Sequence, residues 1–195
     1  MATQAERRHS TRARLIQAAR DLFSDQGYES TPTEQIIAAA GVSRGAMYHH
    51  FGAKRDLFEA VFLTLSEETI ARAIKNSEHG VSPLEDMIQA CFAWLREVRR
   101  PKIAAILLDQ GPQVLGWERA RDLEAETSLA LMTMSLKRAE KAGDIAVPSI
   151  DLTARIINAA LAEVALAALH NAPRVSRETQ EATIRQFILG MTEKR

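Results

Sequence analysis

Cationic and hydroxyl side chains that could bind a polyanion are concentrated between Thr31 and Lys54. Arg44 stands at the start of a short predicted helix, and its guanidinium can donate two hydrogen bonds to the O6 and N7 atoms of a guanine. The phenol of Tyr48 can donate to a phosphate oxygen, and the ammonium group of Lys54 can neutralise a second phosphate. The free backbone amides at a helix N-terminus favour phosphate as well. The segment therefore predicts a surface that binds DNA.

The sequence carries no comparable pattern for catalysis or metal binding. The five histidines are scattered, and neighbours such as His49 and His50 diverge by about 100° around a helix, so they cannot bind one metal ion together. There is no His-Glu-x-x-His pattern, no glycine-rich phosphate loop and no nucleophile elbow. The single cysteine, Cys91, excludes an internal disulfide and a thiolate metal cluster. We therefore expect that the protein is not an enzyme and binds no metal or cofactor. The alternative is a helical bundle without a role on DNA, which would be either a small-molecule-binding protein or an enzyme.

Charge is distributed unevenly along the chain. The 195 residues include 25 basic and 25 acidic side chains, so the formal net charge is zero. Residues 1–55 hold eight of the basic side chains and five of the acidic ones, an excess of three positive charges. A basic N-terminal third on an acidic body suggests a head that binds a polyanion. A charge fluctuation on a solvated face is the alternative.

Composition and hydropathy indicate an ordinary globular protein. Apolar residues make up 46% of the chain and charged residues 26%, as in average soluble domains. The longest apolar stretch, 156–169, is interrupted by Asn158 and Glu163 and is shorter than the roughly 20 residues that a bilayer requires. The N-terminal region reads Glu6, Arg7, Arg8, His9, and no apolar segment follows it. We therefore expect no signal peptide, no membrane partner and a cytoplasmic location.

Apolar residues recur with the period of amphipathic helices, and glycine and proline fall between these segments. Leu15, Leu22 and Phe23 share one such face, and Gly27 is placed to end that helix. No segment shows the alternation of a strand. The chain is therefore predicted to be all-α. The predicted helices number about nine and cover about 11–26, 31–40, 43–50, a segment from 54, 82–98, 103–108, a segment ending near 142, 150–170 and 176–192.

Two short helices joined by a tight turn, over about residues 32–51, have the pattern of a helix-turn-helix. In the turn, Gly41 supplies the unusual backbone angle and Ser43 caps the second helix. Thr31 is a candidate N-cap of the first helix, and Glu34 would complete its capping box. This arrangement places the second helix where it can enter a major groove.

The segment TPTEQIIAAAGVSRGAMYHHFGAKRDLF resembles the DNA-binding head of the tetracycline-repressor (TetR) family of bacterial transcription regulators. The Ala-Gly-Val-Ser turn, Gly45, Tyr48, His50-Phe51 and Lys54 occur at the family's spacing. The resemblance implies a three-helix DNA-binding domain over residues 8–68 and a helical ligand-binding and dimerisation domain over residues 69–195.

The resemblance also implies which residues contact duplex DNA. Thr33 and Ser43 make backbone contacts, Arg44, Gly45, Ala46 and His49 face the groove, and Tyr48 and Lys54 act as phosphate clamps. Ala46 departs from the threonine or serine that the family often has at this position, and it offers only a methyl group.

The middle helices combine apolar, aromatic and thioether side chains with a few polar groups, as a small-molecule pocket does. The same spacing is typical of an ordinary bundle core. The candidate pocket residues are Met87, Cys91, Trp94, Leu95, Leu107, Gln110, Trp117 and Met132.

The last two predicted helices have the composition of an interface. The helix over 150–170 is apolar nearly all round, so it must be covered on more than one side. Two such helices from each of two subunits could form a four-helix bundle about a two-fold axis; burial within a monomer is the alternative. The candidate interface residues are Ile157, Leu161, Val164, Ala168, Ile184, Phe187, Ile188 and Met191.

Together, these expectations predict that the protein is a homodimeric repressor. It would bind a palindromic DNA operator and be released by an unidentified small-molecule effector. A ligand has this effect only if it binds the two arrangements of the subunits with different affinity. The helix that starts near Lys54 is the expected transmitter, because its start touches DNA and its remainder packs on the body.

Overall fold

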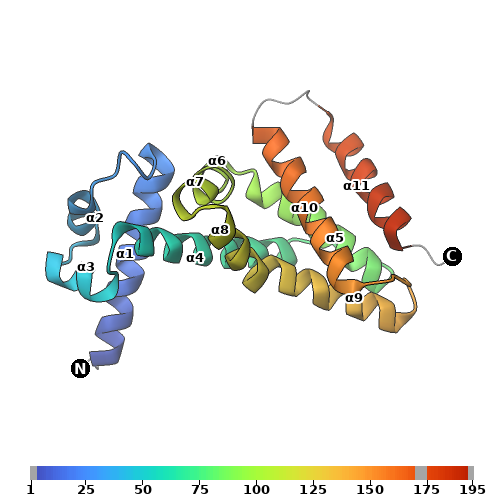
Figure 1. Cartoon of the computed structure of the whole chain (residues 1–195), viewed down its shortest axis with the longest axis horizontal. Coiled ribbons are helices and arrows are strands. Elements are labelled where there is room, and N and C mark those ends of the chain that lie inside the picture. Colours follow the sequence, from blue (N-terminus) through green and yellow to red (C-terminus); the bar gives the residue numbers. More distant parts are fainter. Residues whose placement is uncertain (1–3, 170–174, 193–195) are drawn as a thin grey trace. The chain divides into compact units, whose positions relative to one another are not determined.

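The computed structural model describes residues 4–169 and 175–192. Within these ranges the chain forms nine continuous helical segments and no strand, which confirms the predicted all-α fold (Figure 1). The elements are α1 (Gln4–Gln26), α2 (Thr33–Ala40), α3 (Arg44–His50), α4 (Lys54–Lys75), α5 (Pro83–Val98), α6 (Pro101–Ala104), η1 (Ala105–Gln110), α7 (Gly111–Leu115), α8 (Trp117–Glu124), η2 (Ala125–Leu129), α9 (Ala130–Ala142), α10 (Ile150–Leu169) and α11 (Arg177–Thr192). The π-helical stretches η1 and η2 run on into their neighbours without a break. Along the described chain, no helix combines the length and the apolar content that a membrane span requires.

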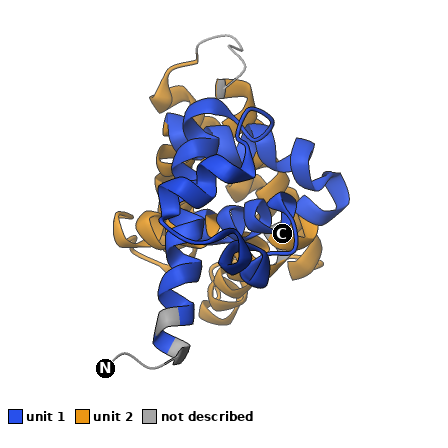
Figure 2. Cartoon of the chain, turned by 90° about the vertical axis from the view of Figure 1, so that its left-hand side faces the viewer, with its two compact units in different colours: residues 1–65, 101–120 blue, residues 66–100, 121–195 orange. Residues whose placement is uncertain are grey.

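The chain divides into two compact units, which Figure 2 shows in different colours. Unit 1 contains residues 1–65 and 101–120, and unit 2 contains residues 66–100 and 121–195. The α6–η1–α7 segment therefore belongs with the predicted DNA-binding head, although it follows α5 in the chain. The predicted domain boundary between residues 68 and 69 stays a prediction.

Large apolar side chains hold the first three helices of unit 1 together. Leu15 and Phe23 of α1, Ile36 of α2 and Met47 of α3 are fully buried. The ring of Phe23 also packs against that of Phe58 in α4, with centroids 5.4 Å apart. Helix α3 has only 7 residues, so the burial of Met47 fixes which face of this helix points to solvent.

The connection between α1 and α2 is fastened by side chains from two other elements of unit 1. The side chain of Gln110 donates to the carbonyl of Phe23 (3.0 Å) and accepts from the N–H of Tyr28 (2.8 Å). The ammonium group of Lys54 donates to the carbonyls of Tyr28 (2.8 Å) and Thr31 (3.2 Å). Backbone groups removed from water cost free energy unless they are hydrogen-bonded. These four bonds therefore fix the path of the chain into α2.

Thr31 does not cap α2, so the predicted capping box is wrong. Pro32 occupies the N-cap position and makes no side-chain cap bond. Thr31 is fully buried, and its hydroxyl donates to the carbonyl of Gly27 (2.7 Å). Glu34 forms an ion pair with Arg44. The hydroxyl of Thr31 is therefore not available to cap α2. Because it is buried, it needs a hydrogen-bond partner nearby, and the carbonyl of Gly27 is that partner.

The segment 101–120 has further ties to α4 within unit 1. Arg55 donates to the carbonyls of Val114 (3.2 Å) and Leu115 (2.6 Å). Gly111 is buried, and a Cβ atom at this position would lie 2.5 Å from the ring of Phe62. Only glycine permits this close approach without a shift of the aromatic ring.

Unit 2 is a bundle in which α5 packs against α9 and α10, and α11 packs against α5 and α10. Its fully buried side chains include Ile88, Leu136 and Ile188. Arg185 of α11 donates two hydrogen bonds to the carboxylate of Glu85 of α5 (2.6 and 2.5 Å). These bonds lower the pKa of Glu85 below its ordinary value and tie the last helix to the bundle.

Candidate functional site

The turn between α2 and α3 sets the direction of α3. Gly41 adopts the left-handed backbone conformation (φ +62°), as the sequence predicts, and its N–H donates to the carbonyl of Ala38 (3.1 Å). The hydroxyl of Ser43 accepts from the N–H of Ala46 (3.1 Å), so Ser43 caps α3 as predicted. Together with the buried Met47, this turn directs the opposite face of α3 to solvent.

The residues predicted to contact DNA lie on α3, on the turn before it and at the first residues of α2 and α4. All of them belong to unit 1. Ser43, Arg44, Gly45, Tyr48 and His49 are exposed, whereas Thr33, Ala46 and Lys54 are half-buried. The structure thus brings these residues onto three neighbouring elements of the chain; their contacts with DNA stay predictions.

Arg44 is held by weak contacts within unit 1. Its guanidinium lies 3.3 Å from the carboxylate of Glu34 on α2 and 5.7 Å from the ring centroid of Tyr48, one turn further along α3. The two side chains of the ion pair are 68% and 65% exposed, and exposed pairs contribute only about 0–1 kcal/mol. Arg44 can therefore leave Glu34 at low cost and donate to an acceptor in front of α3.

Lys54 combines a structural role with a free donor. An ammonium group has three N–H donors, and Lys54 uses two of them on the carbonyls of Tyr28 and Thr31. Its Nζ atom also lies 4.0 Å from the ring centroid of Tyr28. These contacts fix the position of the charge and leave one donor for an anion.

A cationic cluster lies where α1 meets the end of α3. The rings of His49 and His50 are 5.6 Å apart, and the guanidinium of Arg12 lies 5.4 Å from the ring centroid of Phe51. Burial lowers the pKa of His50, and His49, Arg8 and Arg12 lower it further. We call Arg8, Arg12, His49 and His50 the His50 cluster. A negative group placed beside it would be attracted strongly, because four cationic or titratable side chains converge there.

The sequence analysis did not place Arg8 and Arg12 in this cluster because it predicted too late a start for the first helix. Helix α1 begins at Gln4, well before the predicted start near residue 11, and this extension carries Arg8. Ala5 is the only apolar residue in the sequence of this extension, so apolar periodicity gave no signal there. The spacing of Arg8 and Arg12, four residues apart, would have placed both on one side of a longer helix.

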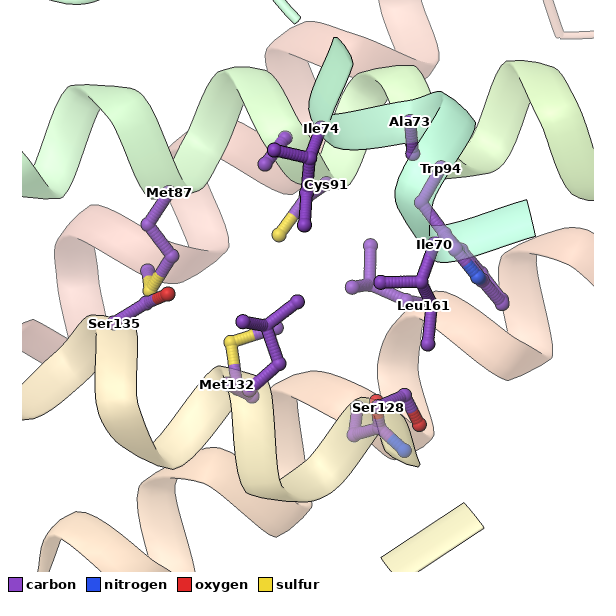
Figure 3. Close-up of a pocket in the computed structure, with 13 residues that line it drawn as sticks. Ile70, Ala73, Ile74, Met87, Cys91, Trp94, Ser128, Met132, Ser135 and Leu161 are labelled. Atoms are coloured by element: carbon purple, nitrogen blue, oxygen red, sulfur yellow. The ribbon is translucent and has the colours of Figure 1, made fainter. Parts of the chain in front are cut away.

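Unit 2 contains an apolar cavity of about 70 Å³ lined by α4, α5, η2, α9 and α10 (Figure 3). Of the predicted pocket residues, Met87, Cys91 and Trp94 of α5 and Met132 of α9 line it. In Figure 3 the side chains of Cys91 and Met132 face the middle of the cavity from opposite helices. The structure therefore brings half of the predicted pocket residues together.

The other predicted pocket residues lie elsewhere. Leu95 is buried on α5 and is not among the described residues that line the cavity. Leu107, Gln110 and Trp117 belong to unit 1, where Gln110 binds the α1–α2 connection. Sequence reasoning grouped them with the body because they follow α5 in the chain.

The predicted interface residues divide between the interior and the surface of unit 2. Ile157, Leu161, Ile184 and Ile188 are buried, Val164 and Met191 are half-buried, and Ala168 and Phe187 are exposed. The large exposed apolar side chains of the two helices are Leu152 (56% exposed) and Ile156 (39%) on α10, and Phe187 (40%) and Leu189 (36%) on α11. Both helices therefore present apolar side chains on two sides.

Comparison with known proteins identifies both parts of the chain. Residues 15–61 match the family model described as bacterial regulatory proteins, tetR family. Residues 84–191, more than half of the chain, match the model described as the tetracyclin repressor-like C-terminal domain.

Individual relatives agree with these family matches. The chain is 26% identical over 153 residues to the HTH-type transcriptional regulator UidR of Escherichia coli K12, covering 75% of this chain and 76% of that protein. It is 33% identical over 122 residues to the HTH-type transcriptional repressor Rv1474c of Mycobacterium tuberculosis, covering 60% and 62%. A crystal structure of a TetR-family transcriptional regulator from Pectobacterium atrosepticum is 29% identical, with a TM-score of 0.81 and 99% of both chains covered. The chain belongs to the TetR family of bacterial proteins and is a DNA-binding transcriptional regulator, not an enzyme.

Proposed function

We propose that this regulator is a repressor that binds a palindromic DNA operator as a homodimer and leaves it when a small-molecule effector binds. The observation that carries the DNA-binding part is the orientation of α3. Met47 is buried on one face, while Arg44, Tyr48 and His49 are exposed on the other. A short helix presented in this way fits the major groove of B-DNA. Because a bacterial operator lies in the cytoplasm, we place the protein there.

Base recognition falls to the first residues of α3. Arg44 donates to the O6 and N7 atoms of a guanine once it leaves Glu34. Gly45 has no side chain, so the backbone approaches the base edges closely. Ala46 is half-buried and offers its methyl group to a thymine. Direct readout therefore rests mainly on Arg44.

Phosphate contacts fix the position of α3 on the duplex. Tyr48 donates its hydroxyl to one phosphate, and Lys54 donates its remaining N–H to another. Thr33 and Ser43 contact the DNA backbone at the N-terminal ends of α2 and α3. The His50 cluster adds positive charge beside these groups.

A second copy of the chain supplies the second recognition helix. One helix of 7 residues contacts only a few base pairs, whereas two copies related by a two-fold axis engage two half-sites. The exposed apolar side chains of α10 and α11 supply a surface for this pairing. The predicted interface residues that are buried in unit 2, such as Ile157 and Ile188, support that surface from beneath.

The cavity of unit 2 is the proposed effector site. It is lined by apolar side chains with a few polar groups, which is the usual composition of small-molecule sites. An effector releases the operator if it binds more tightly to the subunit arrangement that does not fit the groove.

Replacement of Arg44 by alanine should weaken specific DNA binding. The operator duplex is obtained by selecting tight binders from randomised duplexes with the wild-type protein. In fluorescence anisotropy, Arg44→Ala should lose about tenfold to hundredfold in affinity for this duplex, because a bidentate guanine contact contributes about 1–3 kcal/mol. Glu34→Gln should bind more tightly than the wild type, because it frees Arg44 and removes a negative charge. Arg155→Ala, which breaks a comparable surface pair with Asp151, is the control. Wild-type affinity in Arg44→Ala would contradict the assignment.

Operator binding should strengthen as the pH falls from 8 to 6. In the free protein the pKa of His50 is lowered, so the neutral imidazole is favoured. A phosphate beside the cluster favours the protonated form, so binding takes up a proton and the affinity rises on acidification. We expect an increase of roughly threefold to tenfold in the wild type.

His50→Gln should reduce this pH dependence. His79→Gln, which removes a side chain of unit 2 that is 98% exposed, should leave it unchanged. Equal affinity of the wild type at both pH values would show that no phosphate lies beside the cluster, and full pH dependence in His50→Gln would show that a group other than His50 takes up the proton.

A charge placed on the outer face of α11 should separate the subunits. Sedimentation velocity should show a dimer for the wild type and a monomer for Phe187→Glu, because a carboxylate does not enter an apolar interface without a partner. Met134→Glu places the same charge on α9 at a side chain that is 59% exposed and should remain a dimer. A dimeric Phe187→Glu protein would place the interface elsewhere.

A further inference from the structure

The cavity of unit 2 adjoins a second, more polar chamber. The inner chamber is the cavity of about 70 Å³ described above, and the outer chamber has about 210 Å³. Both are lined by Ile74, Met87, Ala90, Leu131 and Ser135. In Figure 3, Met87 and Ser135 lie together at one end of the inner chamber and Trp94 lies toward the opposite end. The two chambers therefore meet at the Met87 end of the inner chamber.

The inner chamber suits an uncharged, apolar group. No acidic or basic side chain lines it among the described residues, and its polar groups are the hydroxyls of Ser128 and Ser135, the amide of Asn158 and the indole N–H of Trp94. Burial raises the pKa of the Cys91 thiol to about 12, so this group is neutral as well. A charge that entered would lose its hydration without gaining a partner. With about 10–15 Å³ needed for each water-sized volume, the chamber holds about five to seven of them, which corresponds to one ring or a short alkyl chain.

Among the described residues, the outer chamber is lined by one guanidinium, that of Arg138, which is exposed to solvent. Its ionisable residues are His79, Asp86 and Arg138. The carboxylate of Asp86 accepts from the N–H of Gly80 (2.8 Å) and lies 3.9 Å from the imidazole of His79. Within the part of the chain that the structure describes, Arg138 forms no ion pair. Asp86 thus already accepts a hydrogen bond from the protein, whereas the guanidinium of Arg138 can donate to an anion that enters the chamber.

We propose that the effector is a compact amphipathic carboxylate, with its apolar body in the inner chamber and its carboxylate at Arg138. The inference rests on the proposed effector role of the cavity and names the chemical class of its ligand. A guanidinium binds a carboxylate through charge-assisted hydrogen bonds of matching geometry. The apolar body gains the free energy of leaving water, and the charge stays at the exposed guanidinium of Arg138, where it keeps part of its hydration.

Three probes with the same alkyl chain test the class of the ligand: hexanoate, 1-hexanol and hexylamine, at pH 7.5. The chain contains 2 tryptophans, and Trp117→Phe leaves Trp94 as the single reporter inside the cavity. Titration of Trp94 fluorescence should show that hexanoate binds about tenfold or more tightly than either other probe. Equal affinity for the three probes, preference for the amine, or no binding would overturn the proposal.

Two substitutions locate the ligand within the site. Arg138→Gln should abolish the preference for hexanoate over 1-hexanol. Lys137→Gln removes the same charge from the neighbouring position of α9, which is exposed like Arg138 but is not among the described residues that line the chamber, and should keep the preference. Ala90→Phe should block all three probes, and Ala90→Leu serves the same purpose if circular dichroism shows that the larger side chain prevents folding. A carboxylate preference that survives in Arg138→Gln would overturn the assignment of the headgroup site.

Operator binding is measured in a separate experiment. Failure of the proposed function can therefore be distinguished from failure of the proposed ligand class. The Trp117→Phe and Arg138→Gln proteins should bind the selected operator duplex without any probe, and hexanoate should lower the affinity of the Trp117→Phe protein. Failure of the wild type to bind any selected duplex would contradict the proposed function, and the fluorescence titrations would still report the ligand class. If hexanoate bound tightly and left the operator affinity unchanged, the proposal that the effector is an amphipathic carboxylate would be overturned.

Discussion

The position of the helix-turn-helix depends on the hydrogen bonds that the backbone between α1 and α2 makes. This connection leaves the helical pattern inside unit 1, where unpaired carbonyl and N–H groups are costly. Gln110 supplies a donor to Phe23 and an acceptor to Tyr28, and Lys54 supplies donors to Tyr28 and Thr31. Two residues that lie far apart in the chain thereby fix one loop. The entry into α2, and through the following turn the direction of α3, is set by these bonds.

Lys54 combines a structural role in this loop with a proposed role in phosphate binding. Its carbonyl contacts hold the loop, and its remaining donor stands where a DNA phosphate is expected. The charge of Lys54 is therefore positioned by hydrogen bonds that the fold requires in any case, whereas Arg44 is held by an exposed ion pair and a contact with the ring of Tyr48. The inner chamber of unit 2 differs from this surface because no acidic or basic side chain of the described residues lines it. We therefore expect a ligand there to be selected by its size and by its apolar character.

Local patterns in the sequence predicted most of the fold and the motif. The helical period, the left-handed Gly41 and the Ser43 cap each depend on residues within a few positions of one another. The role of Gln110 depends on a contact with Tyr28, 82 residues away along the chain, and no local signal reveals it. For the same reason Leu107 and Trp117 were grouped with the pocket, and Thr31 was read as a cap although burial binds its hydroxyl elsewhere.

The most direct test of this account is hydrogen exchange at the backbone N–H of Tyr28. In the wild type, this N–H should exchange slowly, because it donates to the side chain of Gln110. In Gln110→Ala, its exchange should accelerate by at least about tenfold, while Gln113→Ala, which removes an exposed amide bonded to Asp109, should leave it unchanged. Equal exchange at Tyr28 in the wild type and in Gln110→Ala would contradict the claim that Gln110 fixes the path into the helix-turn-helix.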